Sequence, residues 1–302
     1  MKARVVMVIG VILSVCLGGW AQTFPDLVVD SATETVYMSG DKYFSSVAVI
    51  GGATLSYELS DREAGLRIIC GSLLVDERST ISAGHFYPGF EQTGTPDVEV
   101  VNEYGETQGN GSGTYGGRGF NDFDRAKPPY GDRSSFDINP GSRGTDGETV
   151  RFWFSGWNVL PGRGGGAGGG MVTLIGNTVT ISGRISADGE GGRGDPCGLQ
   201  WAGYSGSGGG ILIVARNLTI AESARITANG GEYPIKERCW IPDFPIHYYQ
   251  EAVGKRDGGG GRIKIFYEEG TISPEAVIEA KGWEDGTVHI QQVRSIEQLL
   301  NP

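Results

Sequence analysis

A pattern of three short apolar runs recurs in a fixed order four times along this chain. The clearest copy spans Gly208–Gly230, and the others begin at Leu66, Met171 and Arg262. The spacing inside each copy is kept, whereas the joins between copies vary in length. That combination is typical of a repeat architecture, in which each unit stacks on the next.

The runs inside each copy have the composition of β-strands. Each is about three to five residues long and rich in Ile, Val, Leu and Thr, with no room for a helix between runs. Such strands are too short to form a stable hairpin sheet alone. If the copies are stacked, each strand pairs with its equivalent in the next coil, and the inward Ile and Leu side chains form a continuous core. The pattern therefore predicts an all-β fold, a parallel β-helix.

Glycine runs precede three of the copies, at 164–170 (with Ala167 inside), 208–210 and 258–261. Glycine allows a returning chain to turn with positive φ and allows neighbouring backbones to approach closely. The alternative interpretation is a flexible linker. Linkers, however, are not followed each time by the same strand pattern.

The repeat reads Gly-Gly-Gly, Ile-Leu-Ile, Thr-Ile and then Ile-Ser/Thr-Ala-Asp/Asn-Gly. It resembles the glycine-rich right-handed parallel β-helix proteins of bacterial envelopes, within the pectate-lyase-like superfamily. Tyr130–Asp132, Pro140–Gly144 and Gly286–Ile290 are also similar to that group, and the resemblance covers roughly residues 45–292. It implies a β-helix but no single activity, because this superfamily includes lyases, hydrolases, adhesins and inert scaffolds.

Residues 1–21 have the features of a secretory signal peptide: Lys2 and Arg4, an apolar stretch at Val5–Leu17, and Gly19-Trp-Ala21 as a cleavage site. The apolar stretch is short for a bilayer span. We therefore expect a secreted, extracellular or periplasmic protein of the bacterial envelope without stable membrane insertion after cleavage. Residues 22–302 are expected to form one β-helix domain. Lipidation at Cys16 is the alternative use of this segment.

The chain is acidic, with a formal net charge of −11 that becomes more negative when Lys2 and Arg4 are removed. Bulk charge of this sign argues against nucleic acid, anionic membrane surfaces and other polyanions as partners held by overall charge, which leaves local basic pockets as the alternative. The expected partners are polysaccharides or other envelope components.

Three cysteines follow the expected cleavage site. Cys70 ends an apolar run and is predicted to be a small buried core residue. Cys197 and Cys239 follow Asp188 and Asn229, which occupy equivalent positions of two copies. Loops that leave the same corner of adjacent coils would bring these two cysteines together, which predicts a disulfide; two free thiols are the alternative.

Three insertions separate the copies, at about 84–163, 188–207 and 231–257. All leave the same corner of the repeat, so they should lie on one side of the stack and carry function there. They hold most of the aromatic residues, whose faces suit stacking on sugar rings; the alternative is that these residues form small cores within the insertions. The predicted carbohydrate-binding residues are Trp153, Trp157, Trp201, Trp240 and Tyr248.

If the protein is an enzyme, polysaccharide lyase chemistry needs a group that neutralises a uronate carboxylate and a base, and glycoside hydrolysis needs paired carboxylates. The available residues lie in the insertions, and no lyase or polygalacturonase motif can be transferred onto them. Asp122 and Asp124 could also begin a calcium site, the one cofactor that the sequence suggests. His85 and His289, near strand ends, are expected to be structural. The candidate catalytic residues are Asp122, Asp124, Lys236, Arg238 and His247.

Regular repeats without a recognisable catalytic constellation favour a structural or adhesive scaffold that binds carbohydrate through its insertions. A polysaccharide lyase or glycoside hydrolase is the alternative. A third possibility is a module that stacks with others in a larger surface assembly. The ends of a stack need covering. Residues 24–65 are expected to form the N-terminal cap and the first coils, and the amphipathic tail Val293–Leu300 is expected to cap the other end.

Overall fold

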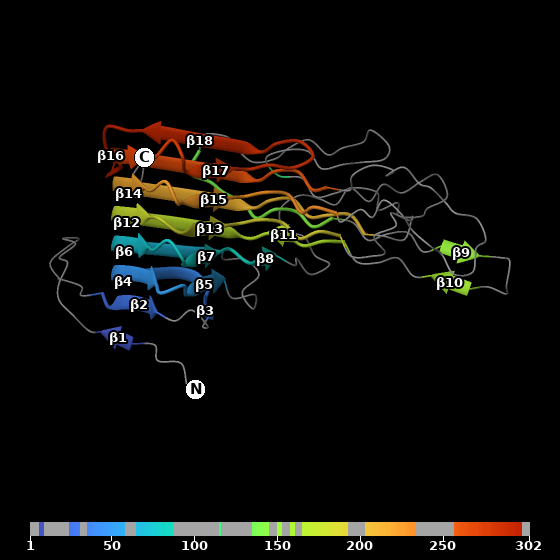
Figure 1. Ribbon diagram of the computed structural model, residues 1–302, viewed down its shortest axis with the longest axis horizontal. Helices are drawn as coiled ribbons and strands as arrows, with labels where there is room; N and C mark the ends of the chain where they lie inside the picture. Colours follow the sequence, from blue (N-terminus) through green and yellow to red (C-terminus); the bar gives the residue numbers. More distant parts are fainter. Residues whose placement is uncertain are drawn as a thin grey trace.

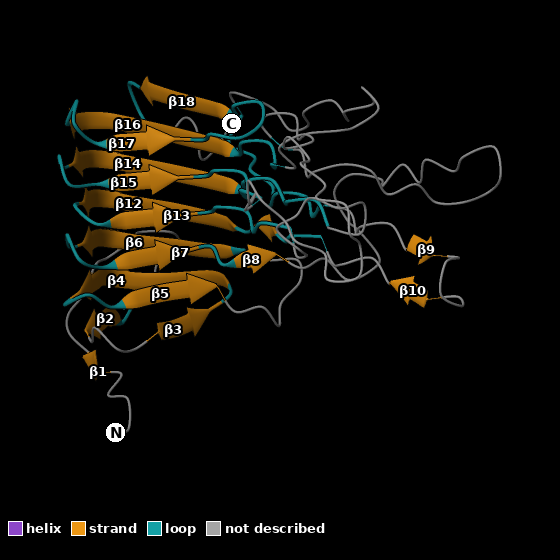
Figure 2. Ribbon diagram, turned by 45° about the vertical axis from the view of Figure 1, so that its right-hand side comes forward, coloured by secondary structure: helices purple, strands orange, loops and turns teal. Residues whose placement is uncertain are grey.

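The computed structural model describes residues 6–8, 24–30, 35–57, 65–86, 115, 135–144, 150–152, 158–160, 165–192, 203–233 and 257–297. Within these ranges the regular structure is almost entirely β-strand, and the strands form parallel sheets (Figures 1 and 2). The expected all-β class is therefore confirmed. No helix among these residues is long and apolar enough to cross a membrane.

The larger sheet contains eight strands, and all neighbours run parallel except the first pair. Its strands stack from the lower to the upper part of Figure 1. In spatial order they are β1 (Val6–Val8), β2 (Asp26–Asp30), β4 (Gly40–Ile50), β6 (Leu66–Val75), β12 (Met171–Ile181), β14 (Gly210–Ile220), β16 (Arg262–Ile272) and β18 (Thr287–Gln292).

The smaller sheet contains six parallel strands, and the chain enters it after each long strand of the larger sheet (Figure 2). One coil thus consists of a strand in the larger sheet followed by a short strand in the smaller one. In spatial order the short strands are β17 (Val277–Glu279), β15 (Arg225–Thr227), β13 (Arg184–Ser186), β7 (Thr80–Ser82), β5 (Thr54–Tyr57) and β3 (Thr35–Met38). Two small antiparallel pairs also form, β8 (His85–Phe86) with β11 (Gly168–Gly169) and β9 (Val150–Phe152) with β10 (Asn158–Leu160).

Each long strand is interrupted at one position, where the pairing omits a residue. Gly176 pairs with Cys70 and Thr178 pairs with Ser72, so that Asn177 has no paired partner in the register. The alternation of buried residues shifts by one position there. Every second residue is buried up to Gly176, and the next buried residue is Val179, three positions later. The three runs predicted for each coil are thus present, but the first two belong to one strand whose hydrogen bonding continues on both sides of the omitted residue.

The core is made of columns of apolar side chains at equivalent positions of successive coils. One such column contains Ile68, Leu174, Ile213 and Ile265, none of which is exposed to solvent. A single cluster of buried residues runs from Leu27 to Ala280. Burying each of these side chains fully contributes about 1.5–3 kcal/mol relative to leaving it exposed, so the repeat pattern is also the main source of stability.

The described part of the tail does not lie over the end of the stack, where we expected it. Ile296 instead packs with Leu212, Val214 and Phe266 on the outer face of the larger sheet. The terminal strand β18 keeps Val288 and Ile290 at 42% exposure each. The end of the stack next to β18 is therefore open at these two residues.

Cys70 is a buried member of the main core cluster, as predicted. Burial raises the pKa of its thiol from 9.0 to about 12. As the pH rises, the thiol therefore ionises at a lower pH in the unfolded chain than in the folded protein. The contribution of this group to the free energy of unfolding is complete below about pH 9 and is lost as the pH rises from there toward 12.

We expect Cys70 to resist iodoacetamide in the native protein at pH 8 and to react once the protein is unfolded in urea, because a buried protonated thiol is a poor nucleophile. Peptide mapping by mass spectrometry measures the labelling of this cysteine separately from the others. Rapid labelling of Cys70 in the native protein would contradict the burial.

Candidate functional site

All site residues predicted from the sequence lie outside the described residues. These are the candidate catalytic or calcium-binding residues Asp122, Asp124, Lys236, Arg238 and His247, the aromatic residues Trp153, Trp157, Trp201, Trp240 and Tyr248, and the cysteines Cys197 and Cys239. The structure does describe where the three insertions begin and end. Any function of the insertions depends on how these points of attachment hold them.

The insertions leave the stack directly after β7, β13 and β15 and return directly before β12, β14 and β16. Asp188 and Asn229 are equivalent, as predicted, because Arg184 pairs with Arg225 and the Asn229 backbone nitrogen donates to Asp188 Oδ1 at 2.7 Å. The roots of the second and third insertions therefore lie beside each other on adjacent coils.

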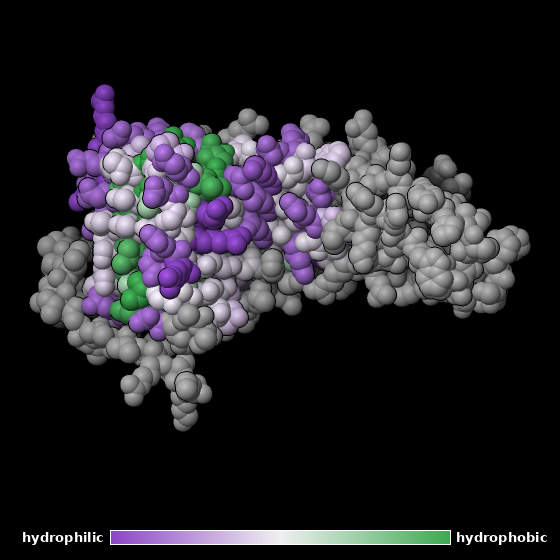
Figure 3. Space-filling view, viewed as in Figure 1, coloured by the Kyte–Doolittle hydropathy of each residue, from purple (hydrophilic) through white to green (hydrophobic). Residues whose placement is uncertain are grey.

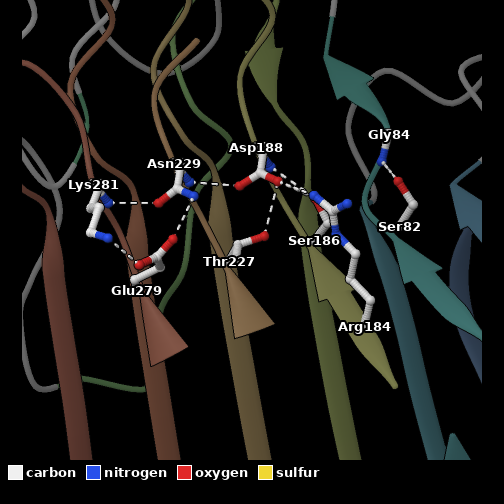
Figure 4. Close-up of polar contacts among 9 residues, drawn as sticks. All are labelled: Ser82, Gly84, Arg184, Ser186, Asp188, Thr227, Asn229, Glu279 and Lys281. Carbon is white, nitrogen blue, oxygen red and sulfur yellow. Dashed lines mark hydrogen bonds and ion pairs between the residues drawn. The ribbon is translucent and has the colours of Figure 1, made fainter. Parts of the chain in front are cut away.

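A series of polar side chains connects the coils at this corner (Figure 4). We call Asp188, Asn229, Glu279 and Lys281 the corner ladder. Asp188 Oδ2 accepts hydrogen bonds from Arg184 Nη2 (2.8 Å), Ser186 Oγ (2.7 Å) and Thr227 Oγ1 (2.9 Å). Its other oxygen accepts from the next coil, so one carboxylate binds two coils together.

The corner ladder continues through the next two coils. Asn229 Oδ1 accepts a hydrogen bond from the Lys281 backbone nitrogen at 2.7 Å, and Asn229 Nδ2 donates to Glu279 at 3.4 Å. The Lys281 ammonium lies 2.6 Å from Glu279 Oε2. A short side chain with an acceptor oxygen is needed at this step to reach the backbone of the neighbouring coil. This requirement explains why Asp188 and Asn229 follow the buried Ala187 and Ala228.

Next to the corner ladder lies a second feature, which we call the glycine layer. It consists of extended segments 139–144, 165–170, 187–192, 203–209, 228–233 and 257–261, which include both roots of the second and third insertions and the returning root of the first. Their backbones donate to one another with a period of three residues. For example, Gly206 and Gly209 donate to Glu190 and Ala187, at 2.9 and 2.7 Å.

A three-residue period is that of the polyproline II helix, which has no internal hydrogen bonds. Its backbone groups therefore have to be satisfied by neighbouring segments. The same period relates Gly166 and Gly169, which donate to Tyr204 and Ser207 at 2.8 and 2.9 Å. Segments from different insertions thus satisfy each other's backbone polar groups.

The glycines of the layer are required by close approach of the backbones. A Cβ atom on Gly209 would lie 1.9 Å from the Gly170 carbonyl oxygen, and one on Gly206 would lie 2.0 Å from that of Ala167. Among the described glycines, positive φ angles occur at Gly40, Gly51, Gly52, Gly84 and Gly270, all outside the layer. Of the two roles expected for the glycine runs, close approach is confirmed here. The linker alternative is wrong for their described residues, which are buried and hydrogen-bonded.

Two buried cations attach part of the first insertion to the outer face of the larger sheet. Lys264, with no exposed surface, donates from Nζ to the carbonyl oxygens of Ser135 (2.8 Å) and Asp137 (2.5 Å). Arg262 is 2% exposed; it donates to Thr287 Oγ1 at 3.0 Å and lies 5.5 Å from the centroid of the Tyr115 ring. We call the corner ladder, the glycine layer and these contacts together the insertion base.

Tyr115 is the described residue that covers Arg262. Burial raises the pKa of its hydroxyl to about 12, although a hydrogen bond from the Asn139 backbone nitrogen at 2.8 Å acts in the opposite direction. The sequence alone does not indicate the burial of these cations, because alternating charged positions in a strand indicate a face exposed to solvent. Only the covering segment changes that interpretation.

Elsewhere on the described surface lies an open cavity of about 260 Å³. It crosses the larger sheet at the omitted positions of the long strands, and Phe24 stacks on Tyr43 at its N-terminal side, with ring centroids 5.8 Å apart. At the other side Arg216 forms an ion pair with Glu297 at 3.1 Å.

His289, expected to be structural, lies in β18 with its ring centroid 5.5 Å from that of Phe266. In the described part of the chain, no three His, Cys, Asp or Glu side chains gather as a metal site.

The described face of the stack shown in Figure 3 is mainly hydrophilic, with a few separate hydrophobic patches over the strands. Comparison of the chain with protein-family models, with curated proteins and with solved structures gave no match.

Proposed function

We propose that this chain is an exported right-handed parallel β-helix that acts as a structural or adhesive scaffold at a bacterial envelope. In this proposal the three insertions are held on one side of the stack and contact carbohydrate through their aromatic side chains. The stack supplies rigidity, and the insertions supply recognition.

The β-helix part of the proposal is supported by the repeated geometry of the coils. Each complete coil has two segments in the larger sheet, separated by the omitted residue, and one segment in the smaller sheet. Equivalent residues stay in register from coil to coil, and the inward columns are mainly apolar, with Lys42 of β4 at the position equivalent to Ile68. Three straight segments per coil around one core are the arrangement that a β-helix requires.

The observation that carries the scaffold role is the insertion base. The described roots of the insertions are hydrogen-bonded to each other in the glycine layer, and the corner ladder binds their coils together. Segments with both roots fixed lose less conformational entropy when they bind a partner. A construction of this kind suits the presentation of a binding surface on a rigid support.

Incubation of the processed protein with acidic and neutral polysaccharides, with and without calcium, tests the proposal. We expect binding to at least one polysaccharide, with neither unsaturated uronate nor new reducing ends. Turnover that disappears on substitution of Asp122, Asp124 or His247 would overturn the scaffold proposal and identify a lyase or hydrolase. The absence of both binding and turnover would overturn the carbohydrate part.

We expect Trp157→Ala and Trp201→Ala, both within insertions, to weaken binding at least about tenfold, because aromatic stacking supplies much of the contact energy at such sites. Trp283→Ala is the matched control, since this tryptophan is 49% exposed but lies outside the insertions. Isothermal titration with the polysaccharide bound in the first assay measures all three. Equal affinities for the three variants would contradict binding through the insertions.

A further inference from the structure

The two ends of the stack are incomplete in opposite ways (Figure 1). At the C-terminal end, β18 pairs only with the first half of β16, from Arg262 to Tyr267. At the N-terminal end, β2 pairs only with the second half of β4, from Ser46 to Ile50, and is followed by the short strand β3. Among the described residues, one end therefore begins a coil without its second half, and the other holds the second half of a coil without its first.

We infer that these ends join, so that the C-terminal end of one copy docks on the N-terminal end of another. In this arrangement β18 lies beside the first half of β4, the second half of β16 beside β2, and β17 beside β3. The strands β18, β2 and β3 then make one complete coil across the junction. The contact repeats the coil-to-coil interface already present within the chain.

The exposure of apolar side chains supports such a junction. Val288 and Ile290 are in register with the fully buried core residues Ile263 and Ile265, yet each is 42% exposed. At the opposite end the described core-facing residues Val36 and Met38 of β3 are only partly buried. Exposed apolar residues at core positions of a terminal strand, such as Val288 and Ile290, favour pairing with another strand.

The facing positions also match in the direction of their side chains. Following the register from coil to coil places Ile272 opposite Val29 and Ile278 opposite Val36, all directed toward the core. It also places Ile290 opposite Lys42, whose side chain is half-buried at this core-facing position of β4. The same register places Glu269 opposite Asp26, which is unfavourable. We therefore expect added salt to strengthen the junction by screening this pair.

The expected signal peptide is part of this inference. Its residues Val6–Val8 form β1, which pairs antiparallel with β2 and so occupies the edge that the second copy needs. Removal of residues 1–21 would free that edge. The inference thus rests on the export part of the proposed function, and processing has to be measured separately from assembly.

The experiment uses the protein secreted by a bacterial host, with its N-terminus determined by mass spectrometry, in sedimentation and light scattering across a dilution series. The processed protein should show an average mass that at least about doubles with concentration, since association follows mass action. Ile290→Lys should remain monomeric, because the added ammonium group would face Lys42 of the second copy. Leu74→Lys is the matched control, because Leu74 is 41% exposed but lies within the stack on β6, and it should assemble like the unaltered chain.

A mixture of two blocked variants tests the polarity of the junction. Val36→Asp blocks the N-terminal end and Ile290→Lys the C-terminal end, so each alone should be monomeric, whereas the mixture should form dimers and nothing larger. A head-to-tail contact without blocked ends extends into filaments. Thermal melting confirms that both variants are folded.

Each unexpected outcome identifies a different error. A processed chain that stays monomeric at all concentrations would overturn the docking, as would self-association of Ile290→Lys. Assembly of a chain that keeps residues 1–21 would overturn the blocking role of β1. An uncleaved N-terminus in the secreted protein would overturn the export proposal instead.

Discussion

Replacement of Gly209 with alanine should lower the free energy of unfolding by about 3 kcal/mol or more. The added methyl group would be placed 1.9 Å from the Gly170 carbonyl oxygen and 2.5 Å from that of Gly169. Both are backbone atoms held by hydrogen bonds within the glycine layer, so neither can rotate away as a side chain would. The layer has to separate locally to accept the substitution.

Urea unfolding measures this change as a shift in the midpoint, with the slope checked for constancy. The matched control is Gly176→Ala in β12. Its added Cβ would lie 3.0 Å from a Val179 methyl group and at least 3.5 Å from the nearest carbonyl oxygens, so we expect a change within about 1 kcal/mol. Equal effects of the two substitutions would mean that the glycine layer is not tightly packed in solution.

The sequence predicted those parts of the fold that a local period can encode. The inward alternation of Val172 and Leu174 follows from the repeat, as does the burial of Cys70. The equivalence of Asp188 and Asn229 followed from aligning the copies. In each case the information lies within one coil, and stacking applies it to all coils.

The glycine layer and the buried cations were not predicted, because their partners are distant in sequence. Glycine has no side chain whose pattern could indicate which segment lies beside it, so the contact of Gly206 with Glu190 is not encoded locally. Lys264 is buried by a segment 127 residues earlier in the chain. An alternating strand predicts which face a lysine occupies, but not what covers that face.

Removal of the carboxylate at Asp188 should lower the free energy of unfolding by about 2–4 kcal/mol. The Asp188→Ala variant loses three side-chain donors, from Arg184, Ser186 and Thr227, and leaves the Asn229 backbone nitrogen without its acceptor. The matched control is Asp41→Ala, whose ion pair with Arg67 spans 3.6 Å and is about half exposed. Such a surface pair contributes about 0–1 kcal/mol.

The corner ladder should also determine how firmly the insertions are held, which global unfolding alone does not measure. In Asp188→Ala we expect the Asn229 amide to exchange with deuterium faster than in the unaltered chain, and the second insertion to be cleaved sooner by a protease, because both depend on local opening at this corner. Asp188→Asn separates the two functions of the carboxylate: it keeps an acceptor for the Asn229 nitrogen but loses the charge that faces Arg184. If Asp188→Asn retains slow exchange while Asp188→Ala does not, the backbone contact holds the insertion. Unchanged exchange in both variants would mean that the glycine layer alone fixes the insertion roots.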